Sequence, residues 1–334
     1  MTNRPPRAFT VSISLCRVNE ALDKGFKLSC SPPSKSQLLK TLINSTRIYK
    51  YIGSNSWTYL DIDGTQLSKV VEELKDISGY GEDRVFFIDA PSMTTIKFLR
   101  QKGETTKEIP WHLLPRAFDK MYPYQKEDIG TIFTNSDKML VAHDMGCGKS
   151  MIALACCVLI EKSSIRDQFS KLVICPSYLR TNWQAELLKW EVDPTMPQII
   201  TKTRDTFDFS KTVIISYDLA VRMIDRLNRA QIDLIICDES HYLKNQKSKR
   251  WNSIKPLLTR TKHVMLLSGT PALSRPEELF TQMSILIPTL FNNWFKFTKR
   301  YCNGKYVYFG PRKTWDSSGS SNSEELSLIM QQVM

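Results

Sequence analysis

The chain has no run of about 18 apolar residues, so the sequence predicts no membrane span. Its first sixteen residues hold too short and too mixed an apolar run for a secretory signal peptide. Eight cysteines are present, but none stands in a Cys-x-x-Cys pair or at metal-ligand spacing. The sequence therefore predicts neither a disulfide framework nor a zinc site, and it favours a reducing compartment.

Acidic residues are missing from two long stretches. Residues 240–276 contain eight Lys or Arg and no acid, and residues 279–315 contain six more, again without an acid. The whole chain has 46 Lys and Arg against 34 Asp and Glu, a formal charge of +12. A surplus of this size indicates a polyanionic partner, most simply a nucleic-acid backbone.

Aromatic residues interleave the second basic stretch. They include Trp294, Phe295, Phe297, Tyr301, Tyr306 and Tyr308. Rings of this kind either form stacking platforms for nucleotide bases or belong to the core, and the sequence leaves both interpretations open.

The chain is organised around residues 138–151. An apolar run at 139–142 leads into a loop with two glycines, and a helix-forming segment follows at once. This order predicts a P-loop: backbone N–H groups surround phosphate oxygens, the Lys reaches the β/γ-phosphates, and the hydroxyl binds Mg²⁺. The helix N-terminus adds a dipole that favours anions. The predicted nucleotide-binding residues of the loop are Asp144, Met145, Gly146, Cys147, Gly148, Lys149 and Ser150.

Two downstream stretches end apolar strands with polar groups. The strand at 232–237 is followed by Asp238-Glu239-Ser240-His241, and the strand at 263–268 ends in Ser268-Gly269-Thr270-Pro271. Asp238 can hold Mg²⁺ together with Ser150. Glu239 is placed to orient and deprotonate the attacking water, so Lys149, Asp238 and Glu239 are the catalytic candidates. Together the three motifs predict that the chain binds a nucleoside triphosphate with Mg²⁺ and turns it over; the family resemblance described next implies that the nucleotide is ATP.

At these motifs the sequence resembles the superfamily 2 helicase-like ATPases, in particular the Swi/Snf branch, over about residues 115–334. Segment 121–130 resembles the adenine-reading Gln motif, with Gln125 as the reader. Segments 172–190 and 213–220 resemble motifs Ia and Ib. The tail at 300–326, with 272–282 before it, is most similar to the HepA-related annealing helicases, which rewind DNA strands and remodel stalled replication forks. His143, Cys147 and Ser150 depart from the usual motif I residues without removing a phosphate or metal contact.

The resemblance implies roles for further residues. Coupling between nucleotide and movement is expected of His241, Ser268, Gly269 and Thr270, although His241 equally fits a plain polar cap. The candidate DNA contacts are Pro176, Ser177, Ser216, Tyr217, Lys244, Lys247, Lys249 and Arg250. The run at 244–250 also fits a nuclear import signal, and it can serve both purposes. A nuclear location is expected, or otherwise a cytoplasmic one.

The fold class expected is α/β. Apolar strands at 138–142, 171–175, 212–216, 232–237 and 263–268 alternate with helical patterns, which predicts a RecA-like parallel sheet wrapped by helices. The expected organisation is an N-terminal arm with an edge-type strand (1–25), a small α+β domain (26–90), a linker or brace (91–118), the ATP-binding lobe (119–290) and the start of a Swi/Snf-specific insertion (291–334). Through Leu38, Leu39, Ser45, Arg47, a Tyr at 49 or 51, and Trp57, the small domain faintly resembles the HARP domain. In that family the domain supports binding to forked or structured DNA.

Motors of this family have two RecA-like lobes, and the second lobe supplies an arginine finger. The tail contains no Gln-x-x-x-Arg motif, so we expect a partial product or half of a split motor that alone binds ATP·Mg weakly and hydrolyses it slowly or not at all. The leading function is the ATP-binding lobe of a DNA-dependent ATPase acting on forked DNA or on single-strand/double-strand junctions. Its other expected partners are a second lobe in cis or trans and replication or repair proteins. The alternative is a nucleotide-gated DNA-binding adaptor without hydrolysis. A P-loop kinase or GTPase is disfavoured, since no Asn-Lys-x-Asp is present.

Overall fold

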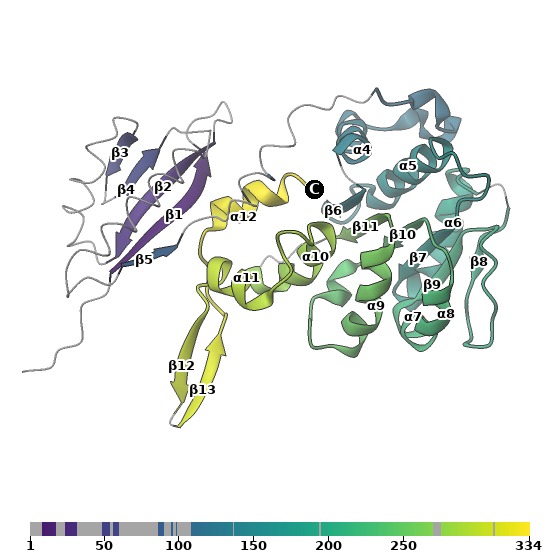
Figure 1. Ribbon diagram of the computed structural model, residues 1–334. Helices are drawn as coiled ribbons and strands as arrows, with labels where there is room; N and C mark the ends of the chain where they lie inside the picture. Colours follow the sequence, from purple (N-terminus) through teal and green to yellow (C-terminus); the bar gives the residue numbers. More distant parts are fainter. Residues whose placement is uncertain are drawn as a thin grey trace, which may run out of the picture. The chain divides into compact units, whose positions relative to one another are not determined.

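The computed structural model describes residues 108–334, except 136, 194, 270–274 and 310, and before them five strands together with Thr95 and Phe98 (Figure 1). The chain divides into two compact units. One contains Met1–Gln101 with Ser320–Ile329, and the other contains Lys102–Gly319 with Met330–Met334. No helix in the described part of the chain is long and apolar enough to cross a membrane.

The first unit contains a five-stranded sheet. Its strands are β1 (Phe9–Arg17), β2 (Lys24–Ser31), β3 (Tyr49–Gly53), β4 (Ser56–Tyr59) and β5 (Phe86–Asp89), in the order β3-β4-β2-β1-β5. The expected hairpin across Gly53 is confirmed, because β3 pairs with β4 in antiparallel fashion. The expected edge strand is wrong: β1 pairs with β2 on one side and with β5 on the other. Alternating polarity marks a strand with two different faces, and it does not reveal how many neighbours the strand has.

Several expectations for the first unit lie outside the described residues. They are the helices expected at 36–43 and 65–77, the basic helix-like piece at 97–107, and most of the residues that carry the HARP-domain resemblance.

The second unit is built on a six-stranded parallel sheet. Its strands are β6 (Lys138–Ala142), β7 (Lys171–Cys175), β8 (Gln198–Ile199), β9 (Val213–Ser216), β10 (Leu234–Cys237) and β11 (His263–Ser268), in the order β6-β11-β10-β7-β9-β8. Every pairing between neighbours is parallel. The five predicted strands are therefore confirmed, with ends that differ by no more than two residues. The expected α/β fold is confirmed with them.

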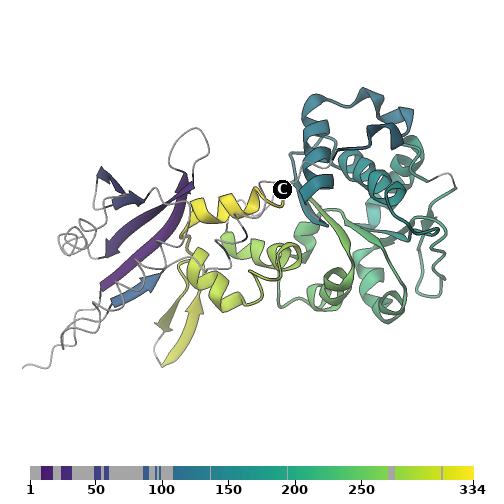
Figure 2. The ribbon, with the colours of Figure 1, turned by 45° about the horizontal axis from the view of Figure 1, so that its top comes forward.

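Helices cover both faces of this sheet. They are α4 (Pro123–Asn135), α5 (Lys149–Lys162), α6 (Arg180–Lys189), α7 (Tyr217–Arg222), α8 (Ile224–Arg229) and α9 (Lys249–Arg260). Right-handed crossovers run outward from β6 through α5 to β7 and return from β9 through α7–α9 to β11. The outward and return paths therefore place α5 and α6 on one face and α7–α9 on the other (Figures 1 and 2). Short 3-10 helices lie at Trp111–Leu113, Arg116–Lys120, Ser177–Leu179, Ser240–Leu243 and Pro276–Glu278.

The core lies on both sides of the sheet. Helix α5 is buried at every position from Met151 to Leu159, because α4 covers the side that faces away from the sheet. Its apolar surface all round is typical of an interior helix. The strands β7, β9 and β10 are buried along their whole length, as expected for parallel strands covered on two faces.

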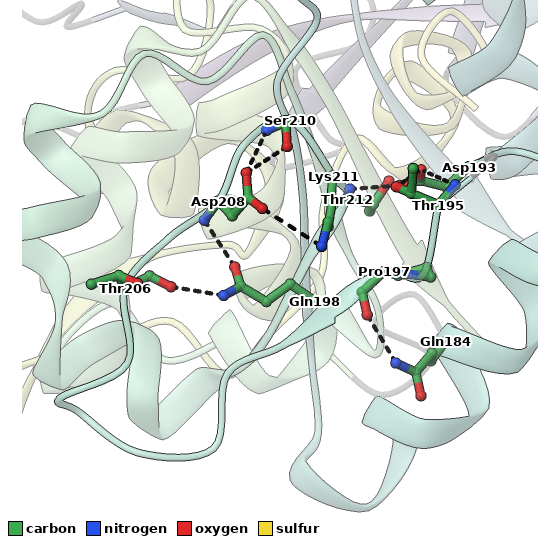
Figure 3. A network of polar contacts seen from close by, with 10 residues as sticks. All are labelled: Gln184, Asp193, Thr195, Pro197, Gln198, Thr206, Asp208, Ser210, Lys211 and Thr212. Carbon is green, nitrogen blue, oxygen red and sulfur yellow. Dashed lines mark hydrogen bonds and ion pairs between the residues drawn. The ribbon is translucent and has the colours of Figure 1, made fainter.

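The edge strand β8 has only two residues, and a polar network holds it in place (Figure 3). The Asp193 carboxylate accepts hydrogen bonds from Thr212 N–H at 2.6 Å and from the Thr195 hydroxyl at 2.9 Å. Gln198 donates to the Thr206 carbonyl and accepts from Asp208 N–H, both at 2.9 Å. These bonds fasten the loop between β8 and β9, which has few apolar anchors of its own.

The rest of the second unit follows β11. Helices α10 (Leu279–Leu286) and α11 (Trp294–Tyr301) precede a hairpin of β12 (Lys305–Phe309) and β13 (Arg312–Asp316). The last helix, α12 (Ser323–Met330), belongs to the first unit except for Met330. The sequence did not predict the hairpin as strands. Near the end of the chain, Leu140 N–H of β6 donates to the Val333 carbonyl at 2.8 Å, so this segment pairs with the outer edge of the sheet.

Candidate nucleotide-binding site

The parallel strands bring all the predicted motifs to one edge of the sheet. The P-loop follows β6, Gly269 follows β11, and Asp238 follows β10. Because β6, β11 and β10 are neighbours in that order, these residues lie next to one another at the carboxyl ends of their strands. Open α/β sheets bind their ligands at this edge.

The P-loop has the backbone that its glycines predict. Gly146 and Gly148 have φ values of 85° and 78°, in the left-handed region that favours glycine. Helix α5 begins at Lys149 directly after Gly148. A Cβ atom at Gly148 would lie 2.5 Å from Gln125 Nε2, so this position also lacks room for a side chain. The loop therefore presents the backbone and the N-terminus of a buried helix toward the sheet edge.

The Lys149 ammonium lies within the loop itself. Its Nζ donates to the carbonyls of His143 at 2.9 Å and Asp144 at 3.0 Å. His143 lies beside Asp128 of α4, with 2.9 Å between Nε2 and Oδ2. The residue that departs from the usual motif thus ties the loop to α4.

The Gln motif lies against the P-loop. Gln125 is 5% exposed; its Oε1 accepts from Tyr122 N–H at 3.0 Å and its Nε2 donates to the Cys147 carbonyl at 3.3 Å. The Tyr124 hydroxyl donates to the same carbonyl at 3.0 Å. The structure therefore brings Gln125 to the nucleotide loop, and its reading of adenine stays a prediction.

Asp238 is buried and held by two donors. Its Oδ2 accepts from the Trp183 indole N–H at 2.8 Å, and its Oδ1 accepts from Glu239 N–H at 2.9 Å. Burial raises the pKa of Asp238 above its ordinary value of 3.8, while these two hydrogen bonds and the charge of Lys149 act in the opposite direction. Lys149 is therefore near enough to influence the Asp238 carboxylate electrostatically.

Glu239 stands in a strained backbone conformation. Its φ of 50° lies in the left-handed region, which is uncommon for a residue with a side chain. Its Oε2 is 3.1 Å from Nδ1 of His241. Residues held in such conformations cluster at functional sites, where the surrounding structure enforces them. The turn separates the Glu239 side chain from that of Asp238 and leaves it partly exposed.

The coupling candidates meet the P-loop from the next strand. A Cβ atom built on Gly269 would lie 3.7 Å from Lys149 Nζ and 3.9 Å from the His143 carbonyl. Ser268 is fully buried at the end of β11, and Thr270 lies outside the described residues. The structure thus brings Gly269 to the nucleotide loop, while the coupling roles remain predictions.

These residues fit ATP with Mg²⁺. The loop offers backbone N–H groups, one ammonium and the N-terminus of α5 to phosphates, and Asp238 and Ser150 offer oxygens to a hard cation. Among the described residues, no group of three or more His, Cys, Asp or Glu forms a metal site. Mg²⁺ itself is usually held by one or two protein oxygens together with phosphates and water.

The candidate DNA contacts divide into buried and exposed residues. Ser177, Lys244, Lys247 and Lys249 are exposed, although Lys244 is ion-paired with Glu278 at 3.1 Å. The Tyr217 side chain is 2% exposed and its hydroxyl donates to the Asp238 carbonyl at 2.8 Å, so it supports Asp238, and a DNA contact at this position stays a prediction. Buried Ser216 instead caps α7 through its hydroxyl.

Pro176 and Arg250 complete the set of DNA-contact candidates. Pro176 is buried at the end of β7. Arg250 is paired with Asp218 at 2.9 Å and lies over the rings of Tyr217 and Tyr242. Neither side chain is a free surface group.

Two residues that support Asp238 were missed by the sequence analysis. Trp183 is 3% exposed, and its indole N–H donates to the Asp238 carboxylate. Tyr217 holds the Asp238 backbone. Both contacts join residues 21 or more positions apart in the sequence, so no local sequence pattern predicts them.

Comparisons with known proteins agree with this geometry. A family model described as the SNF2-related domain matches residues 91–334. The DNA annealing helicase and endonuclease ZRANB3 of Bos taurus is 35% identical over 223 residues, which are 64% of this chain and 20% of that protein. The SWI/SNF-related matrix-associated actin-dependent regulator of chromatin subfamily A-like protein 1 of Xenopus tropicalis is 34% identical over 288 residues, 84% of this chain and 29% of that protein. The chain thus spans less than a third of the length of either relative.

A solved structure shares the fold. The SWI2/SNF2 ATPase core of Sulfolobus solfataricus, determined in complex with dsDNA, superposes with a TM-score of 0.54 at 22% identity. The match covers 69% of this chain and 46% of that one.

Proposed function

The chain belongs to the SNF2-related family, and from that premise we propose that it is the ATP-binding lobe of a DNA-dependent ATPase that anneals or remodels DNA, such as stalled replication forks. The observation that carries the proposal is the shared sheet edge. Lys149, Asp238 and Gly269 follow three neighbouring strands, β6, β10 and β11, and lie around one place.

The residues at this edge have different roles in ATP binding and hydrolysis. Lys149 and the N–H groups of the loop bind the phosphates, and the negative charge of the phosphates is favoured at the N-terminus of α5. Asp238 and Ser150 hold Mg²⁺, which when bound neutralises developing phosphate charge. Glu239 accepts the proton of the attacking water, and the nearby His241 ring orients its carboxylate.

DNA and a second lobe complete the proposal. The exposed Lys247 and Lys249 lie on the segment after Asp238 and Glu239, where a phosphate backbone can reach them. A second RecA-like lobe, in cis or trans, would close over ATP and supply the arginine finger that hydrolysis at a useful rate requires. The nucleus is the proposed location, and replication or repair proteins are proposed partners.

Lysine and glutamate variants test the chemistry. Lys149→Ala is expected to abolish binding of a fluorescent ATP analogue, while Glu239→Gln keeps binding and loses turnover by about 10²–10⁴-fold. Lys162→Ala is the matched control: it lies at the other end of α5, where its Nζ donates to the Leu113 carbonyl at 2.8 Å. Equal loss of nucleotide binding in Lys149→Ala and Lys162→Ala would contradict the site.

DNA stimulation tests the motor. ATP turnover is measured with and without forked DNA, for this chain and for a version extended through any downstream coding sequence. Stimulation by DNA in the extended version supports the ATPase. Nucleotide-dependent DNA binding without turnover supports the adaptor function instead, and the absence of any DNA response in both versions refutes both functions.

A further inference from the structure

The β12–β13 hairpin carries an exposed aromatic face. In its register Tyr306 lies opposite Trp315 and Tyr308 opposite Lys313, so these four side chains share one face of the two-stranded sheet. Tyr306 is 53% exposed and Tyr308 is 69% exposed. Both figures that show the ribbon place the hairpin beyond the end of α11, apart from the parallel sheet (Figures 1 and 2).

The rings of this face form a continuous row with α11. Trp315 meets Tyr306 edge-on at 5.0 Å between ring centroids and Phe295 of α11 at 5.5 Å. Phe295 is itself 53% exposed. Lys313 Nζ lies 4.1 Å from the centre of the Tyr306 ring, a cation–π contact that places positive charge among the rings.

The hairpin is fixed rigidly to α11. The Trp315 indole donates to the Thr298 hydroxyl at 3.0 Å, and Gly304 N–H donates to the Thr298 carbonyl at 2.9 Å. A Cβ atom on Gly304 would lie 2.5 Å from the Trp315 ring and 2.8 Å from the Thr298 carbonyl oxygen, so only glycine permits this approach. An isolated two-stranded hairpin is marginally stable, and this packing holds the exposed rings in place.

The charge around the face is positive. Lys313 shares the face with the rings, whereas Lys305, Arg312 and the single acid Asp316 alternate onto the other side of the two strands. Helix α11 adds Lys296, Lys299 and Arg300 and has no acid. Exposed rings beside basic side chains fit a polyanion that also offers flat apolar surfaces, which is the chemistry of a nucleic-acid strand.

We propose that this face of the β12–β13 hairpin stacks on unpaired DNA bases next to the ATPase lobe. Bases inside a duplex are already stacked on their neighbours, whereas unpaired bases expose both faces to aromatic rings. The face therefore favours single strands and the open arms of a junction over continuous duplex. This inference rests on the proposed function in taking DNA as the partner, and it adds the part of the DNA that is recognised.

The test measures binding of labelled oligo(dT) and of a blunt duplex by fluorescence anisotropy. Changing both Tyr306→Ala and Tyr308→Ala is expected to weaken oligo(dT) binding about 10- to 100-fold. Duplex binding should change less than threefold. The matched control is Tyr306→Phe with Tyr308→Phe, which keeps the rings and should stay within about threefold of the parent.

Two further measurements guard against a folding artefact. Tyr308→Ala alone changes the most exposed ring, and it should weaken oligo(dT) binding while leaving the thermal midpoint and ATP-analogue binding unchanged. An oligonucleotide carrying 5-iodouracil should crosslink to Tyr306 or Tyr308, as identified by mass spectrometry.

The outcomes separate this inference from the proposed function. Equal loss of oligo(dT) and duplex binding, or no loss in the alanine variants, overturns base stacking while leaving the ATPase proposal intact. Self-association of the parent that the alanine variants abolish, seen by sedimentation velocity, assigns the face to a second copy and also overturns it. A parent chain that binds neither DNA overturns base stacking, and the proposed function falls with it only if the version extended through downstream coding sequence also shows no response to DNA.

Discussion

The support of Asp238 by Trp183 makes a sharp prediction for the variant Trp183→Phe. The change keeps an aromatic ring but removes the indole N–H that donates to Asp238 Oδ2 at 2.8 Å. Trp183 is 3% and Asp238 9% exposed, so water does not readily replace the lost donor. A hydrogen bond to a charged group contributes about 1.5–3 kcal/mol, and the unfolding free energy at neutral pH should fall by that amount.

The sign of the pH dependence follows from the same contact. A donor to the carboxylate lowers its pKa, so its removal raises the pKa of Asp238 beyond the increase that burial already causes. A neutral, protonated Asp238 gains less from the indole donor than the carboxylate does. The difference in unfolding free energy between the parent and Trp183→Phe should therefore shrink as the pH falls through the raised folded-state pKa of Asp238. Mg²⁺ competes with that proton, so the acid limb of Mg²⁺-dependent nucleotide binding should move to higher pH.

A second tryptophan on the same helix is the control. Trp190 also donates through its indole, to Glu186 at 2.6 Å, but at a partly exposed site away from Asp238. Denaturant unfolding and titration of a fluorescent ATP analogue with Mg²⁺, both from pH 5 to 8, should distinguish Trp183→Phe from Trp190→Phe. Identical Mg²⁺ and pH profiles for the two variants would refute the role assigned to Trp183.

Three further predictions concern other contacts. Asp193→Asn should remove acid-sensitive stability. Burial acts to raise the pKa of Asp193, but hydrogen bonds from Thr212 and Thr195 lower this pKa below 3.8, so the stabilisation is present above pH 3.8 and is lost as the pH falls through the lowered value. The acid-unfolding midpoints of parent and variant check this. Gly304→Ala should lower the thermal midpoint, since the added carbon overlaps Trp315, and an unchanged midpoint would contradict the close packing. Tyr217→Phe should cost about 1–3 kcal/mol in urea unfolding by leaving the Asp238 carbonyl unpaired, and a cost near zero would show that water replaces the hydroxyl.

Local patterns predicted most of the parallel sheet. The apolar runs before the P-loop, Asp238 and Ser268 had to become buried strands, because glycines and polar residues end them sharply. Since parallel strands place their carboxyl ends at one edge, the proximity of Lys149 to Asp238 followed from the order of motifs.

Contacts between distant segments could not be predicted in the same way. Strand β8 has two residues and depends on the Asp193 and Gln198 networks, so no periodicity reveals it. Tyr306 and Tyr308 alternate with other residues as in a strand, but the sequence analysis predicted no strand at this position. The burial of Tyr217 has a similar origin, because it depends on helix α9, which packs over α7.

Gly269 shows that a motif can specify an unfilled volume as well as a chemical group. An alanine Cβ there would be in ordinary contact with Met145 and with the Lys149 ammonium, whereas a longer side chain would intrude on the space beside that ammonium. The end of β11 therefore limits the room around the cation at the start of α5. A displacement of Gly269 toward the P-loop would therefore restrict the Lys149 side chain without removing either of its hydrogen bonds.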